Sequence, residues 1–267
     1  MFLRSLSIIS SLPLLAISIL FGNSTFNQQE TSICISDNIY VCDTSYDYKC
    51  AGSTLPGVVT LDMPEPGDQG RQHSCAAWAV VYDAGSYYMH FTKRQPYSDS
   101  GTLSPMFVYN RLSKGRSGIT SLLDNLILFK KEGACSFKTM PYNPYDCSTQ
   151  PDSAQRLDAA KHKIKGWQQT DSYNLQSLKT ILSQKKPVIF SIIIDEGFDK
   201  ITAPFIWRER CGTLEQTHTM VITGYDDARH AFLVMNSWGI SWADKGFVWI
   251  DYDFFLKNVL GCCYVLI

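Results

Sequence analysis

The sequence QGRQHSCAAWA, residues Gln69 to Ala79, decides how this chain is interpreted, because Cys75 within it is either a structural cysteine or a nucleophile. The segment before it is rich in proline and glycine, and an apolar run of helix length follows it. Ser74 is a favourable N-cap residue, so we predict that a helix begins at Cys75. The positive end of a helix lowers the pKa of a thiol, and the thiolate is the reactive form. Cys75 is therefore a candidate nucleophile.

The composition is that of a globular protein. A chain of 267 residues is long enough for one large domain or for two subdomains that share a cleft. Hydrophobic residues make up 45% and charged residues only 18%, which excludes disorder over most of the length. The formal net charge of -1 provides no basic excess to neutralise phosphates, so we expect no nucleic-acid partner.

The first 24 residues have the pattern of a secretory signal peptide. Arg4 precedes an apolar run from Ile8 to Phe21, and small residues follow at 22–24. The alternative is a membrane anchor, but Pro13 interrupts the run, which is shorter than the roughly 20 residues needed to span a bilayer. We therefore predict cleavage and a secreted, extracellular or periplasmic protein, with no membrane contact afterwards.

The nine cysteines fit an exported protein, because disulfides persist in oxidising compartments. An odd number leaves at least one thiol unpaired, which is compatible with a reactive Cys75. Residues 25–54 are polar, lack helical periodicity and contain Cys34, Cys42 and Cys50. We interpret this segment as a disulfide-tied N-terminal extension.

From residue 55 onward the pattern predicts a helical half followed by a β half. Helices are expected over residues 104–112, 121–131, 153–164 and 175–184. Strands are expected over residues 188–194, 219–225, 231–236 and 246–251. This order predicts an α+β fold with the helical half at about 55–180, the β half at about 181–267 and a cleft between them.

One of the five histidines is placed to serve a thiol nucleophile. His218 stands at the start of a strand-like run, where its ring would be held rigidly, and Asn236 follows the next apolar strand. An asparagine oxygen can orient an imidazole, and an indole such as that of Trp238 can exclude water from their hydrogen bond. Cys75, His218 and Asn236 thus form a candidate catalytic triad. No two histidines have the spacing of metal ligands, so we expect no metal.

These segments together resemble the papain family of cysteine peptidases over residues 55–267. The matching blocks are Gln69, six residues before the cysteine; Ser74-Cys75 with Ala77 and Trp78; His218 followed by an apolar run to Gly224-Tyr225; and Asn236-Ser237-Trp238-Gly239. Cys75 precedes His218 by 143 residues, and Asn236 follows 18 residues later, which suits the family.

The resemblance implies a papain-like fold of two subdomains. The helical half carries the nucleophile, and a β-barrel-like half carries histidine and asparagine. It also implies an exported endopeptidase that acts through a thioester acyl-enzyme, with Cys75, His218 and Asn236 as the triad and Gln69 in the oxyanion hole. Protein or peptide substrates, a proteinaceous inhibitor as partner and no cofactor are expected with it.

Some residues depart from the family pattern. Gln72 replaces a cysteine that is common three residues before the nucleophile, and Ala76 replaces a tryptophan. His73 stands where the family usually has glycine, beside the S1 subsite, and would narrow that site or favour an acidic P1 residue. Otherwise its side chain points to solvent.

Two disulfides are also expected. The resemblance implies that Cys211 pairs with Cys262 or Cys263. Cys135 and Cys147 enclose a short loop and are a second candidate pair.

Other functions remain open at this level. The N-terminal extension is short for an inhibitory propeptide, and if it stayed attached it would cover the cleft or block part of it, as in exopeptidases. The chain would otherwise be a non-catalytic binding protein with a papain fold. A transglutaminase-like transferase shares the Cys/His chemistry, but the blocks at Gln69 and Asn236 favour a peptidase.

Overall fold

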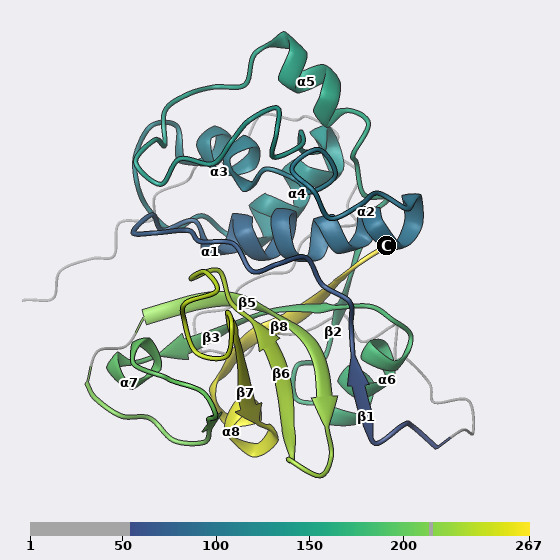
Figure 1. Ribbon diagram of the computed structural model, residues 1–267, viewed down its shortest axis with the longest axis vertical. Coiled ribbons are helices and arrows are strands. Elements are labelled where there is room, and N and C mark those ends of the chain that lie inside the picture. The colour runs from purple at the N-terminus through teal and green to yellow at the C-terminus, as the bar shows by residue number, and fades with distance from the viewer. Residues whose placement is uncertain (1–53, 214–215) are drawn as a thin grey trace, which may run out of the picture. The chain divides into compact units, whose positions relative to one another are not determined.

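The computed structural model describes residues 54–213 and 216–267, and these form a helical layer and a sheet layer (Figure 1). The expected signal peptide, and the expected extension up to residue 53, lie outside the described residues. Among the residues that are described, no helix has the length and apolar character needed to cross a membrane. The α+β fold predicted from the order of elements is confirmed.

The helical layer is built around a continuous helical segment that begins at Cys75. It consists of α1 (Cys75–Ala77), a π-helical segment η2 (Trp78–Asp83) and α2 (Ala84–Lys93). Around it lie α3 (Pro105–Ser113), α4 (Leu122–Glu132) and α5 (Ser153–Ala159). The predicted helix start at Cys75 is therefore confirmed.

Helix α5 is shorter than the predicted 153–164, and its C-terminal end is packed against Gly133. A Cβ atom on Gly133 would lie 1.9 Å from the carbonyl oxygen of Ala159. At the same end of the helix, the Asp158 carboxylate accepts hydrogen bonds from Ser136 and Thr139. These tertiary contacts accompany the end of the helix at Ala159, where the local sequence predicted a continuation.

The sheet has the strand order β2-β8-β3-β5-β6-β7-β4, with β1 paired to β5. The strands are β1 (Val58–Thr60), β2 (Trp167–Thr170), β3 (Val188–Ile194), β4 (Ile206–Trp207), β5 (Gln216–Asp226), β6 (Ala231–Met235), β7 (Phe247–Asp251) and β8 (Val259–Leu266). Helices α6 (Leu175–Ser183), α7 (Glu196–Asp199) and α8 (Tyr252–Asn258) accompany it. Strands β1 and β2 come from the stretch that was expected to be helical.

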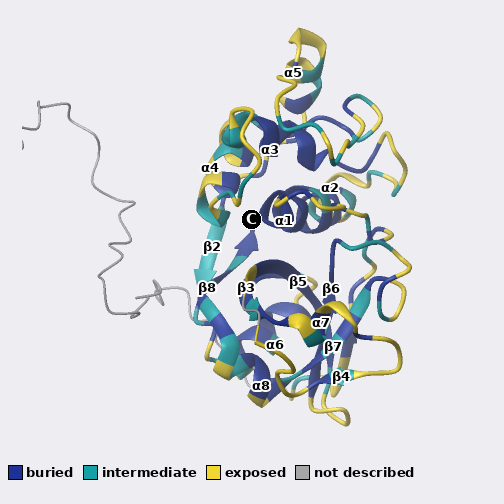
Figure 2. Ribbon diagram, turned by 90° about the vertical axis from the view of Figure 1, so that its left-hand side faces the viewer, coloured by how far each residue is buried: buried dark blue, intermediate teal, exposed yellow. Residues whose placement is uncertain are grey.

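Strand β5 lies between two hydrophobic cores. Met220 and Ile222 face the core of the sheet half, whereas Val221 belongs to the core under the helices. The strand is accordingly buried from His218 to Tyr225, and Figure 2 shows α1 and most of β5 coloured as buried. Burial on both faces explains why the apolar residues Met220, Val221 and Ile222 follow one another without alternation. It also places His218 directly beneath the helical layer.

The disulfides expected within the described residues are wrong. Cys135, Cys147, Cys211 and Cys263 all have free thiols. Cys135 and Cys263 are fully buried in hydrophobic cores, whereas Cys147 is half-buried and Cys211 is exposed on a loop. The two cysteines of each expected pair thus lie in different environments. Burial also raises the pKa of the Cys135 thiol to about 12.

Candidate active site

Cys75 is the first residue of the helical segment and is buried, with 5% of its surface exposed. The first N–H groups of a helix have no partner within it, so they are available to a negative charge near the thiol. Ser74 occupies the N-cap position, as predicted, although its side chain makes no capping hydrogen bond. Its Oγ instead lies 2.8 Å from the hydroxyl oxygen of Tyr142.

His218 and Asn236 are brought together by the pairing of β5 with β6. Val221 pairs with Met235, so Asn236, at the end of β6, lies beside the start of β5. The Nε2 of His218 lies 2.7 Å from Oδ1 of Asn236, and both residues are buried. Because the asparagine oxygen accepts from Nε2, Nδ1 is the ring nitrogen left to serve the thiol.

His218 lies close enough to Cys75 to lower the pKa of its thiol, which links the two halves of the molecule at the site. Burial by itself raises the pKa of the Cys75 thiol. The hydrogen bond and the charge of His218, together with hydrogen bonds from Thr219, outweigh this effect, so the pKa of Cys75 lies below its ordinary value. The geometry therefore favours a thiolate at Cys75.

Aromatic rings cover the imidazole of His218. The ring centre of Trp238 lies 4.9 Å from that of His218, and Trp238 in turn packs edge-on against Trp242 and Phe198. These rings keep water from the His218–Asn236 hydrogen bond, which is stronger in a medium of low dielectric constant.

Gln69 is held at the cleft by Ser237. Its backbone N–H donates to the carbonyl of Ser237 at 2.8 Å, and its Oε1 accepts from the Ser237 hydroxyl at 2.7 Å. Its Nε2 donates one hydrogen to the carbonyl of Gln72 at 2.7 Å. The side-chain amide is thus oriented at both ends, and its nitrogen carries a second hydrogen that is available to a ligand.

A cleft of about 520 Å³ contains the predicted site residues Gln69, His73, Cys75 and His218. The remaining lining residues are Asp68, Gly70, Arg71, Gln72, Ile119, Ile194, Asp199, Gln216, Thr217 and Trp238. His73 is exposed there. Asn236 lies behind His218, where it contacts the imidazole. All five residues expected at the site therefore gather in one place.

The family assignment follows from the same residues. A model of papain family cysteine proteases matches residues 64–259, a range that includes Gln69, Cys75, His218 and Asn236. The chain belongs to this family. The expected fold is confirmed by the solved structures of papain-like proteases that it resembles.

Individual papain family members are distant from this chain. A cathepsin L-like peptidase of Aedes aegypti is 26% identical over 220 residues, which cover 77% of this chain and 58% of the relative. Xylellain, a cysteine protease from Xylella fastidiosa, is 22% identical with a TM-score of 0.69, covering 80% of this chain and 86% of that structure. A Carica candamarcensis cysteine protease solved in complex with E-64 is 20% identical with a TM-score of 0.59, covering 78% and 98%. The chain spans little more than half the length of its first curated relatives.

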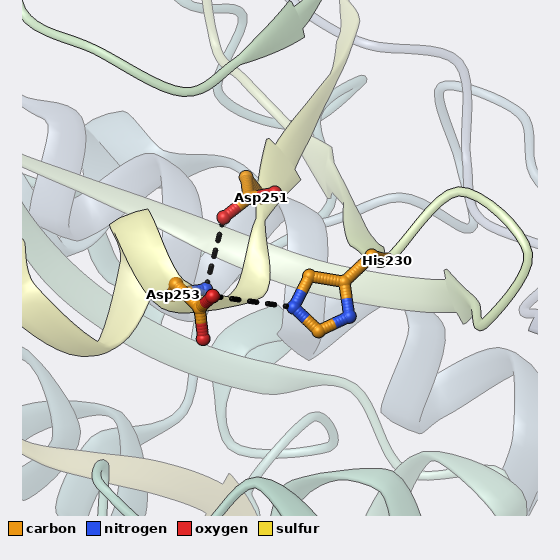
Figure 3. A group of neighbouring side chains, drawn as sticks. All are labelled: His230, Asp251 and Asp253. Atoms are coloured by element: carbon orange, nitrogen blue, oxygen red, sulfur yellow. Dashed lines mark hydrogen bonds and ion pairs between the residues drawn. The ribbon is translucent and has the colours of Figure 1, made fainter.

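The resemblance to the papain family implies that the reaction needs no metal. One group of side chains nevertheless has the ligand types of a metal site. In the described part of the chain, the possible ligand atoms of His230, Asp251 and Asp253 lie within 4.8 Å of one another (Figure 3). Asp251 accepts the backbone N–H of Asp253 at 3.0 Å and lies near Arg208. His230 Nε2 lies 3.6 Å from Asp253. We interpret the group as the cap of α8 with a surface ion pair.

The sequence did not point to several residues that support this papain family site. Tyr142, Ser237, Thr219 and Phe198 contact the predicted residues, yet only Ser237 and Thr219 lie in recognised blocks, and neither was assigned a role there. A hydroxyl beside the nucleophile has no spacing signature, because its partner lies far away in the chain. A Ser or Thr directly next to a predicted catalytic residue is the one signal that would have found Ser237 and Thr219.

Proposed function

We propose that this protein is a cysteine peptidase that hydrolyses peptide bonds through Cys75, His218 and Asn236. The observation that carries the proposal is the buried chain of contacts from the Cys75 thiol to His218 and on to Asn236 at 2.7 Å. The lowered pKa of Cys75 and the open cleft beside it support the same function. Membership of the papain family makes peptide hydrolysis the natural chemistry for this arrangement.

The reaction would proceed in two steps. The Cys75 thiolate adds to the peptide carbonyl carbon, and the carbonyl oxygen becomes an oxyanion that accepts from Nε2 of Gln69 and the N–H of Cys75. The C–N bond then breaks while His218 gives its proton to the leaving amine, which leaves a thioester. Water, deprotonated by His218, attacks the thioester and releases the acid and the thiolate. Asn236 holds the imidazole in position throughout.

Labelling with an epoxysuccinyl inhibitor of the E-64 type tests this function first. The mildly reduced protein is expected to form an adduct at Cys75 and, in parallel, to lose cleavage of a peptide library, because the inhibitor alkylates the same thiolate. The adduct is located by mass spectrometry of peptides. Adducts spread over Cys147 and Cys211, with cleavage retained, would count against the proposal.

We further propose that the predicted signal peptide directs export and that the exported enzyme cleaves proteins at internal bonds. The alternative is an exopeptidase whose N-terminal extension blocks part of the cleft. Peptides blocked at both ends are cleaved by an endopeptidase and resist an exopeptidase, so they separate the two. N-terminal sequencing of the protein recovered from culture medium tests export and the cleavage site together.

His73 is proposed to bind substrate and to favour an acidic residue before the cleaved bond. The exposed His73 and the neighbouring Arg71 line the cleft close to Cys75 and present positive charge when His73 is protonated. An ion pair at such a site contributes up to about 1 kcal/mol, which corresponds to about fivefold in rate.

The variant His73→Gly is therefore expected to lose about fivefold in kcat/KM on substrates with glutamate at P1 and nothing on substrates with alanine there. His90→Ala, a histidine outside the cleft lining, is the control. An unchanged P1 preference would mean that the His73 side chain only faces solvent.

A further inference from the structure

The hydroxyl of Tyr142 meets the loop before Cys75 at three points. Its oxygen lies 3.0 Å from the carbonyl oxygen of Gln69, 2.8 Å from Oε1 of Gln72 and 2.8 Å from Oγ of Ser74. A phenol has one proton, so that proton is shared between the two acceptor oxygens, while the Ser74 hydroxyl donates to the phenol oxygen. One side chain thus ties together residues 69, 72 and 74.

This loop carries both donors of the proposed oxyanion hole. Gln69 provides its Nε2, and Cys75 provides its backbone N–H. Gln69 Nε2 donates its other hydrogen to the carbonyl of Gln72, so the position of Gln72 determines where the amide points. Gln72 is buried, and its own Nε2 donates to the carbonyl of Asp146 at 3.1 Å. The contacts of Gln72 with Tyr142 and Asp146 therefore help to fix the Gln69 amide, which is the group that faces the reacting atoms.

Tyr142 is itself held firmly. Its ring packs edge-on against Trp78 with centroids 4.8 Å apart, and the residue is half-buried. Burial raises the pKa of Tyr142, so the hydroxyl keeps its proton and remains a donor near neutral pH. Tyr142 is absent from the described residues that line the cleft, so it acts on a substrate only through other groups.

We propose that Tyr142 is a positioning residue of the oxyanion hole. Its hydroxyl holds the segment from Gln69 to Cys75 in the shape that aims the Gln69 amide and the Cys75 N–H at one oxygen atom. The inference rests on the proposed peptidase function, because only that reaction forms an oxyanion at this place.

Tyr142→Phe removes the hydroxyl and keeps the ring. We expect kcat on a doubly blocked peptide to fall about tenfold with KM nearly unchanged, because a misplaced donor weakens mainly the transition state. Binding of a peptide aldehyde, whose adduct places an oxyanion in the same hole, should weaken by about the same factor. Alkylation by iodoacetamide forms no oxyanion, so its rate constant should stay within about twofold of that of the unchanged protein.

Tyr87→Phe is the matched control. It removes a hydroxyl that donates to the carbonyl of Lys185 at 3.0 Å, and its kcat should equal that of the parent protein. If Tyr142→Phe does not fold, as judged by thermal unfolding, Ser74→Ala removes a contact of the same hydroxyl and should lower kcat and aldehyde affinity but not alkylation.

The outcomes separate the two proposals. A parent protein that cleaves no peptide contradicts the peptidase function itself. A parent that cleaves, with variants equal to it in kcat and aldehyde affinity, overturns the role of Tyr142 alone. A parallel fall of alkylation and hydrolysis in the variants would show that Tyr142 acts on the thiolate or on the fold, which also overturns the inference.

Discussion

Replacing Cys75 with alanine is expected to lower kcat for peptide hydrolysis by about 10⁴-fold or more, because no other group can form the thioester. The substitution leaves a small apolar side chain at a buried position beside the cleft, where water can replace the thiol as the partner of His218, so the fold should persist. The measurement is kcat on a doubly blocked peptide, together with the midpoint of thermal unfolding.

The control for this variant is Cys211→Ala, which removes an exposed free thiol on a loop. It is expected to retain the kcat of the parent protein. Peptide cleavage that survived in Cys75→Ala and was lost in another cysteine variant would contradict the assignment of the nucleophile.

Removing His218 should produce the second large effect, a shift of the reactive thiol to higher pH. The pKa of Cys75 lies below its ordinary value only because His218 and Thr219 outweigh the effect of burial. In His218→Ala, burial still raises the pKa of Cys75, whereas the interaction that lowered it most is gone. The pKa of Cys75 should therefore rise above the ordinary thiol value. Because each pKa unit changes the thiolate fraction about tenfold, the alkylation rate at pH 6 should fall about tenfold for every unit by which the pKa rises.

The measurement is the pH profile of iodoacetamide alkylation at Cys75. In the parent protein the rate should stay high as pH falls past the ordinary thiol pKa and decline only when the thiolate is protonated. In His218→Ala the alkylation rate should begin to decline at a higher pH than in the parent protein. His230→Ala, which removes a half-exposed imidazole, is the control and should leave the profile unchanged. Identical profiles for the parent and His218→Ala would show that His218 does not stabilise the thiolate.

Much of the fold could be predicted from local patterns. Strand β3 has the predicted bounds, Val188–Ile194, because an apolar run lies there between Pro187 and Asp195. Strand β2, Trp167–Thr170, was missed because its sequence, WQQT, has no apolar alternation, and it is a strand only through its pairing with β8. The π-helical segment Trp78–Asp83 also has no sequence signal.

The predicted disulfides failed for a related reason. Spacing along the chain suggested a bridge between Cys135 and Cys147, yet Cys135 belongs to the buried core of the helical layer and Cys147 to a loop. A disulfide requires Cα atoms within about 7 Å and suitable directions of the Cβ atoms. Those conditions are set by packing, and the spacing in the sequence does not report them.

The sequence by itself determined the residue types and the order of the candidate site, because a helix start at Cys75 and two strand ends at His218 and Asn236 are encoded by neighbouring residues. Only the tertiary structure decided that these three side chains meet, since Cys75 reaches His218 only when α1 packs on β5. The hydrogen bond from Tyr142 to the carbonyl of Gln69 joins residues 73 apart in the chain and was likewise decided by the tertiary structure. Such contacts depend on how whole layers pack, so no local pattern in the sequence predicts them.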